Sequence, residues 1–174
     1  FTYAVTTTDR FISKASPEEY CFEYDDRKNL VKQIKQGSIL LLSHFGGWAT
    51  ASKCFTEEDV TIHVVMNEAM IASAAAFEKS IENKIKDRTK IIDLSKGNIA
   101  ASLDIAHALS RHESVALMAD RALAEKHLKH CDFFGGKACF NGNPFKLAYK
   151  TRNNLVSMFV VLIGKKRYRI QYEI

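Results

Sequence analysis

The stretch Ser-His-Phe-Gly-Gly-Trp at residues 43–48 combines residue types that can support proton transfer. An imidazole titrates near neutral pH, so His44 could take a proton from a reacting hydroxyl. Glycines at 46 and 47 let a substrate approach the main chain, and their N–H groups would lie where a helix begins. That position favours the negative charge of an oxyanion. The alternative interpretation is a capping histidine whose glycines only permit a tight turn.

The elements around this stretch alternate between strands and helices, which predicts an α/β domain with a mostly parallel (mixed) central sheet flanked by helices. The apolar run at 38–43 is typical of a strand covered on both faces. In a helix capped by Asn98, apolar spacing predicts a buried face of Ile99, Leu103, Ala106 and Leu109. The pattern predicts further strands at 60–66, 90–94 and 114–119, helices at 27–37, 46–55, 68–88 and 144–152, and an edge hairpin of 155–163 with 167–174.

Two polar residues follow strands of this expected sheet. His44 comes after the strand at 38–43, and Asp120 comes after the strand at 114–119. Reactive groups in such sheets gather beyond the carboxyl ends of the strands. We therefore expect both side chains at one crevice.

The composition fits one domain of 174 residues with a net charge of +5. The positive charge favours an anionic partner, but it is spread along the chain without a nucleic-acid reader motif, which argues against nucleic acid. The four cysteines have no close spacing, so we expect reduced thiols of a cytoplasmic protein, buried and inert at Cys54, Cys131 and Cys139. Because the sequence starts without methionine and stops inside an alternating pattern, we expect a fragment that lacks segments at both ends.

The sequence "GSILLLSHFGGWATA" resembles the signature of the bacterial lipid A biosynthesis (late) acyltransferases, which are similar to the lysophospholipid and glycerolipid acyltransferases. The signature is a glycine, an apolar strand, and then His-x-Gly-Asn-Trp-acid. His44, Gly46 and Trp48 match it, while Gly47 replaces the asparagine. Four later stretches match in order: a helix ending in Arg88, "SVALMADRA", "CDFFGGKACFNGNPFKLAYKT", and the closing strands "LVSMFVVL" and "YRIQYEI". The resemblance covers residues 27–174.

This resemblance implies a single acyltransferase-like domain over 1–174, acting as an O-acyltransferase. It would move a fatty acyl group from acyl carrier protein to a hydroxyl of a lipid A precursor or similar anionic glycolipid. His44 would be the general base and Asp120 its partner, without metal or cofactor. The protein would lie peripherally on the cytoplasmic face of the bacterial inner membrane, with the membrane surface as a partner. The substrate-binding residues would be Phe45, Gly46, Gly47, Trp48, Arg88, Arg121, Phe134 and Gly135.

Ala49 stands where the family carries an acid that orients the histidine. Three explanations stay open: a variant whose acid was removed, another carboxylate in its place (Asp120 before Glu68), or a slow or inactive relative. The last leaves a second function, a non-catalytic module that binds a glycolipid or carrier protein.

Other residues also keep two interpretations. Arg88 and Arg121 hold phosphate or oxyanion, or form surface ion pairs. Phe133 and Phe134 line an acyl channel or belong to the core. Trp48 lies at the lipid interface or packs its short helix. His63 is expected to be a core histidine, and the basic run 165–169 either meets anionic groups or is a solvated hairpin tip.

Overall fold

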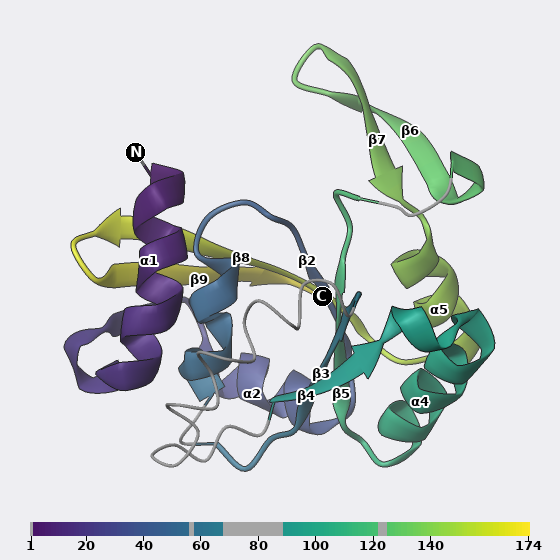
Figure 1. Ribbon diagram of the computed structural model, residues 1–174, viewed down its shortest axis with the longest axis horizontal. Coiled ribbons are helices and arrows are strands. Elements are labelled where there is room, and N and C mark those ends of the chain that lie inside the picture. Colours follow the sequence, from purple (N-terminus) through teal and green to yellow (C-terminus); the bar gives the residue numbers. More distant parts are fainter. Residues whose placement is uncertain (1, 56–57, 68–88, 122–124) are drawn as a thin grey trace.

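The computed structural model describes residues 2–55, 58–67, 89–121 and 125–174 (Figure 1). The expected helix at 68–88, with Glu68 and Arg88, lies outside them. The helices, 3₁₀ segments (η) and strands are α1 Thr2–Ala15, η1 Pro17–Glu19, β1 Cys21–Tyr24, α2 Arg27–Lys35, β2 Ile39–Leu42, η2 Trp48–Phe55, β3 Ile62–Met66, β4 Thr89–Asp93, η4 Leu94–Lys96, α4 Asn98–Ser110, β5 Ser114–Met118, η5 Glu125–His127, β6 Leu128–Phe133, β7 Gly136–Asn141, α5 Asn143–Thr151, β8 Leu155–Gly164 and β9 Arg167–Glu173.

Seven of the described strands form one sheet in the order β1-β9-β8-β2-β5-β3-β4. Only β8 and β9 pair antiparallel; every other neighbouring pair is parallel. The predicted α/β fold with a mostly parallel, mixed sheet is therefore confirmed. The predicted hairpin of the last two strands also forms, but its place at the sheet edge was wrong. Cys21–Tyr24 pairs alongside Arg167–Ile170, so β1 covers the outer side of β9.

The central strand β2 is buried on both faces, as its apolar run predicts. Leu40 and Leu42 pack on one face with α2, β8 and β9. Ile39 points to the other face, where α4 and α5 cover it. Successive side chains alternate across a strand, so four apolar residues serve two cores.

Helix α4 forms where expected, but its buried face and its cap differ from the prediction. Ile99 and Leu103 are 80% and 55% exposed, whereas the buried residues are Ala101, Ile105, Ala108 and Leu109. Alanines let the helix approach the sheet closely, so its small side chains face inward. Gly97, not Asn98, is the N-cap residue, and no side chain caps this helix end.

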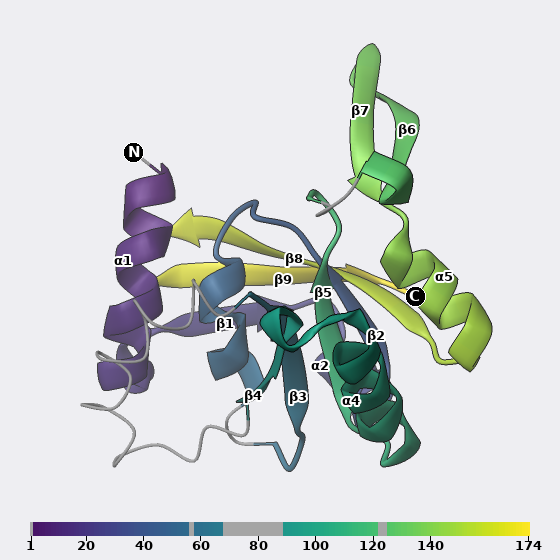
Figure 2. The same ribbon diagram turned by 45° about the vertical axis from the view of Figure 1, so that its right-hand side comes forward.

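Strands β6 and β7 form a separate two-stranded hairpin that projects from the body of the molecule (Figures 1 and 2). The sequence predicts only a turn-rich stretch here. Both strands are largely exposed, and no helix in the described part of the chain covers them. Cys131 and Cys139 are therefore exposed, and the expectation that these two thiols are buried was wrong.

Candidate active site

The pairing of β2 with β5 brings His44 and Asp120 together. Leu42 lies opposite Met118 at the carboxyl ends of these parallel neighbours. The pairing continues for one more bond, from the Ala119 N–H to the Leu42 carbonyl at 2.8 Å. His44 and Asp120 each come two residues after the paired positions, Leu42 and Met118. Both residues therefore lie at the same edge of the sheet, beyond the carboxyl ends of β2 and β5.

The Asp120 carboxylate binds both the ring and the main chain of His44. His44 Nδ1 lies 3.0 Å from Asp120 Oδ1 and 3.0 Å from Oδ2. The His44 backbone N–H donates to Oδ2 at 3.2 Å. The side chains are 22% and 29% exposed, so solvent or a substrate can reach them. Within the described part of the chain, every hydrogen bond of this ring uses Nδ1, which leaves Nε2 to exchange protons.

The two glycines after His44 are required by close packing against β8 and β9. Gly46 has φ +69°, and a Cβ atom there would lie 2.2 Å from the Val160 carbonyl oxygen. A Cβ at Gly47 would lie 2.4 Å from Cε1 of Tyr168. Any larger residue at either position would therefore push the turn, and His44 with it, away from the sheet.

The Gly47 amide is already used inside the fold. Its N–H donates to the Val160 carbonyl at 2.7 Å. The expectation that both glycine amides face an oxyanion is therefore wrong for Gly47 in this conformation. Thr50, which is fully buried, donates its hydroxyl to the Gly47 carbonyl at 2.6 Å and holds the same turn from the other side.

Trp48 contacts the histidine directly. The two rings meet edge to face, with centroids 5.2 Å apart and planes at 77°. The His44 ring thus contacts both a carboxylate and an indole, which together restrict its orientation. Ala49 follows in η2 and is partly buried, while the neighbouring Phe45 is exposed.

Of the remaining expected site residues, those that the structure describes form no hydrogen bond and no salt bridge with this pair. Arg121 directly follows Asp120 and is exposed, and Arg88 lies outside the described residues. Phe134 and Gly135 occupy the tip of the β6–β7 hairpin. Phe134 is 95% exposed, so the interpretation of this side chain as core was wrong.

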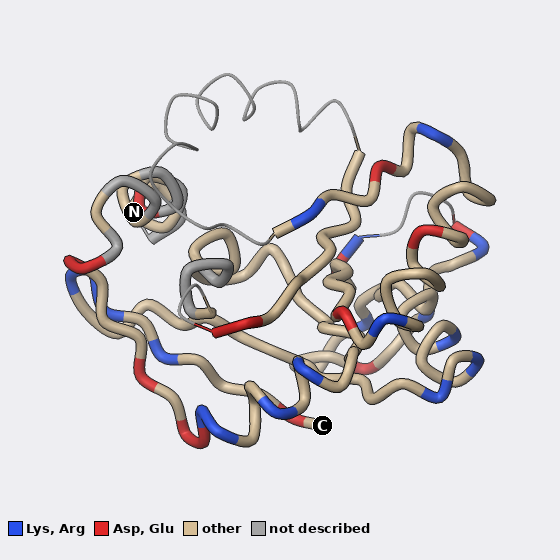
Figure 3. The backbone as a smooth tube through the Cα atoms, turned by 90° about the horizontal axis from the view of Figure 1, so that it is seen from below, with Lys and Arg blue, Asp and Glu red and all other residues tan. Residues whose placement is uncertain are grey.

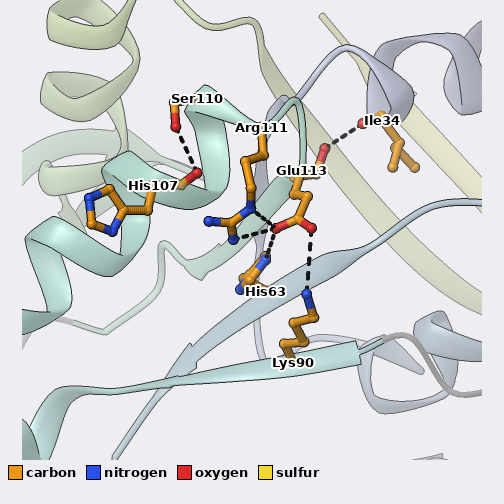
Figure 4. Close-up of polar contacts among 8 residues, drawn as sticks. Ile34, His63, Lys90, His107, Ser110, Arg111 and Glu113 are labelled. Atoms are coloured by element: carbon orange, nitrogen blue, oxygen red, sulfur yellow. Dashed lines mark hydrogen bonds and ion pairs between the residues drawn. The ribbon is translucent and has the colours of Figure 1, made fainter.

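His63 is buried near the amino ends of the strands and belongs to an ionic cluster whose lysine and arginine are exposed (Figure 4). Its Nε2 is 2.7 Å from Glu113 Oε2, as expected for a core histidine with a partner. Glu113 also accepts from Arg111 Nη2 at 2.7 Å and from Lys90 at 3.5 Å. Burial raises the pKa of Glu113, but the hydrogen bonds from Arg111 and His63 and the Lys90 charge outweigh it and lower that pKa to about 2.

Neither a metal centre nor a spanning helix is seen in the described ranges. No three His, Cys, Asp or Glu side chains gather there as a metal ion would require. His130, on the hairpin, instead contacts Cys139, with 3.2 Å from Nδ1 to Sγ. None of the helices in the same ranges has the length and apolar character needed to cross a bilayer.

Sequence reasoning missed the residues that support the site from a distance. Val160 and Tyr168 hold the glycine turn from the last two strands. Asn141 binds the end of β5: its N–H donates to the Ala119 carbonyl at 2.7 Å and its Nδ2 to the Met118 carbonyl at 3.3 Å. The turn formers "NGNP" indicate only a local bend, so no signal pointed to this contact.

Comparison with known proteins identifies the family to which the chain belongs. A comparison with curated protein sequences gave no match. The model of the family described as bacterial lipid A biosynthesis acyltransferase matches residues 4–173, which include both β2 with its His44 turn and β5 with Asp120. The chain belongs to the bacterial lipid A biosynthesis acyltransferase family.

Proposed function

We propose that this chain transfers a fatty acyl group from acyl carrier protein to a hydroxyl of a lipid A precursor, with His44 as the general base. The family supports acyl transfer in lipid A biosynthesis. The observation that carries the rest is the 3.0 Å contact between His44 Nδ1 and Asp120, in a pair that is partly open to solvent. We also propose that the protein works peripherally at the cytoplasmic face of the inner membrane, where such an acceptor is found.

Asp120 supports this role by fixing the tautomer of the histidine. Its carboxylate accepts from Nδ1–H, so the lone pair of the ring is on Nε2. Nε2 takes the proton of the acceptor hydroxyl as the oxygen attacks the thioester carbonyl. The tetrahedral intermediate collapses, the C–S bond breaks, and Nε2–H returns the proton to the departing thiolate. Asp120 stabilises the imidazolium between these two steps.

Binding of the intermediate is assigned to groups at the turn and near it. Gly46, which has no side chain, lets the substrate come close to the main chain. Phe45 and Trp48 supply apolar contacts for the acyl chain or the acceptor. Arg121 and Arg88 would bind the phosphates of the acceptor or the oxyanion. No metal and no cofactor is needed for this chemistry, because the thioester is already activated.

Ala49 favours the second candidate, a non-catalytic relative that binds the glycolipid or the carrier protein. The acid that the family signature places there is missing. Against this stands the carboxylate of Asp120, which already occupies the orienting position at Nδ1. We therefore favour catalysis, with Asp120 in place of the missing acid.

The experiment is an acyl-transfer assay with acyl carrier protein thioester and a lipid A precursor, read by mass spectrometry of the product. The wild type should transfer the acyl group, and His44→Ala should lose about a hundredfold to ten-thousandfold in rate. His107→Ala, an exposed histidine of α4, is the matched control and should keep the wild-type rate. Equal rates for wild type and His44→Ala would contradict the base assignment. Glycolipid binding without turnover from any donor would favour the binding module.

A further inference from the structure

The hairpin and the helix that follows it hold most of the excess positive charge of the chain. Residues 125–152 carry six lysines and arginines but only two acidic residues, which gives four of the net charge of +5. The same segment exposes aromatic side chains at Phe133, Phe134, Phe145 and Tyr149. Exposed aromatic rings next to basic residues are typical of surfaces that meet the interface of an anionic bilayer.

Three of the four basic residues in the second basic cluster, residues 165–169, form ion pairs. Lys166 pairs with Glu19, and both Arg167 and Arg169 pair with Glu23. Figure 3 shows acidic residues interleaved with basic ones along the strands that lead to the C-terminus. Lys165, Arg167 and Arg169 are exposed, which agrees with the interpretation of a solvated hairpin tip. Because of the ion pairs with Glu19 and Glu23, residues 125–152 are the stronger attraction for anions.

The tip of the hairpin presents an aromatic cluster to solvent. Phe134 is 95% and Phe133 50% exposed, and their ring centroids lie 4.5 Å apart. Phe133 also packs edge to face against Phe140 of the facing strand, with ring centroids 5.5 Å apart. A two-stranded hairpin without a covering layer is marginally stable in water. Two adjacent, solvated phenylalanines at its end therefore indicate a partner that covers them.

We propose that the β6–β7 hairpin docks the protein on an anionic bilayer, with Phe133 and Phe134 entering the interface and Lys126 and Lys129 meeting the head groups. A tip of two rings is far smaller than the roughly 800 Å² per partner of a stable protein interface. It is sufficient for insertion into a membrane, which needs no complementary pocket. The choice of a bilayer rests on the proposed function, because its acceptor is an amphiphile that resides there.

The base of the hairpin connects this docking element to the site. Asn141, at the end of β7, donates to the Ala119 carbonyl, one residue before Asp120. Gly142 donates to the His127 carbonyl at 2.8 Å and closes the base of the hairpin. A membrane bound at the tip would thus lie beyond the sheet edge that carries His44, on the side from which a lipid acceptor must come.

The test is flotation of the full chain with phosphatidylethanolamine vesicles, prepared with and without phosphatidylglycerol. The double variant Phe133→Ser/Phe134→Ser should lower the partition coefficient about tenfold or more, because the apolar area of both rings no longer enters the bilayer. Lys126→Gln and Lys129→Gln should each lower it about fivefold, only on vesicles with phosphatidylglycerol. Ile99→Ser/Leu103→Ser removes similar exposed apolar area on α4 and should leave flotation unchanged.

The depth of insertion is measured by the quenching of tryptophan fluorescence by brominated lipids in the variant Phe134→Trp. The wild type, in which Trp48 is the tryptophan, gives the background signal. Stronger quenching in the variant supports insertion of the tip. Wild-type flotation by the double phenylalanine variant, or an equal loss in the α4 control, would overturn the proposal. Loss of acyl carrier protein binding with intact flotation would overturn it too and assign the hairpin to a protein partner. Flotation needs no turnover, so an inactive wild type that still floats through its hairpin refutes only the proposed function.

Discussion

At the scale of single residues, Asp120 decides how His44 is held. It is a positioning carboxylate, because it contacts the ring and backbone of the histidine rather than the substrate. Asp120→Asn should keep the fold but remove the acceptor that fixes the tautomer, so kcat should fall about a hundredfold or more with little change in KM. Steady-state kinetics would measure both constants.

A suitable control for this variant is Asp104→Asn, which changes an exposed carboxylate of α4. It should leave both constants unchanged. A loss confined to KM in Asp120→Asn would show that the carboxylate binds substrate, and an unchanged kcat would refute the positioning role.

The sequence could predict this pair but not its support. His44 and Asp120 each follow a buried apolar strand, and parallel neighbours end at one edge, so general rules sufficed. The role of Gly46 depends on Val160, more than a hundred residues away in the chain. No local pattern encodes such a contact, so the glycines were interpreted as free donors when the Gly47 amide is in fact bonded.

At the scale of elements, Glu113 ties α4 to three strands at the end of the sheet opposite the site. It accepts from Arg111 at the end of α4 and from His63 of β3 and Lys90 of β4, and it directly precedes β5 (Figure 4). Because its folded pKa, about 2, lies below the unfolded value of 4.5, it stabilises the fold above the unfolded pKa. That contribution should be lost as pH falls toward the folded pKa.

Urea unfolding of wild type and Glu113→Gln, near neutral pH and near pH 3, measures this contribution. The wild type should lose more stability on acidification than the variant does, because the variant has no carboxylate to protonate. Glu173→Gln, at an exposed carboxylate of β9, should keep the wild-type pH slope. Parallel slopes for wild type and Glu113→Gln would contradict the role of the cluster.

Element types were predictable from apolar periodicity, but helix faces were less so. The spacing of α4 fits the Ile99–Leu103 face as well as the alanine-rich one, and only contact with the sheet selects between them. The β6–β7 strands were missed for a related reason. Their burial does not alternate, because neither core formed by the described residues lies against them.

At the scale of the whole molecule, a buried carboxylate joins the first helix to the last strand beneath the site. Asp9 of α1 accepts from Tyr20 at 2.8 Å and from Tyr168 of β9, the residue that packs against Gly47. Figure 2 shows α1 lying beside the ends of β8 and β9. The first helix and the start of the last strand thus meet where the glycine turn is supported.

This junction predicts sensitivity to alkali. Burial first, and then hydrogen bonding to Asp9, raise the pKa of Tyr168 and that of Tyr20 well above the ordinary value. Groups with a raised folded pKa stabilise the protein below the unfolded pKa, which is about 10 for tyrosine, and this stabilisation is lost as pH rises beyond it.

Tyr168→Phe should lower the free energy of unfolding by about 1–2 kcal/mol at neutral pH, because Asp9 loses one hydrogen-bond donor. It should also reduce the loss of stability above about pH 10, which urea unfolding would measure against Tyr149→Phe, an exposed tyrosine of α5. If Tyr168→Phe loses as much stability in alkali as the wild type, the Asp9 junction is not what couples the first helix to the sheet.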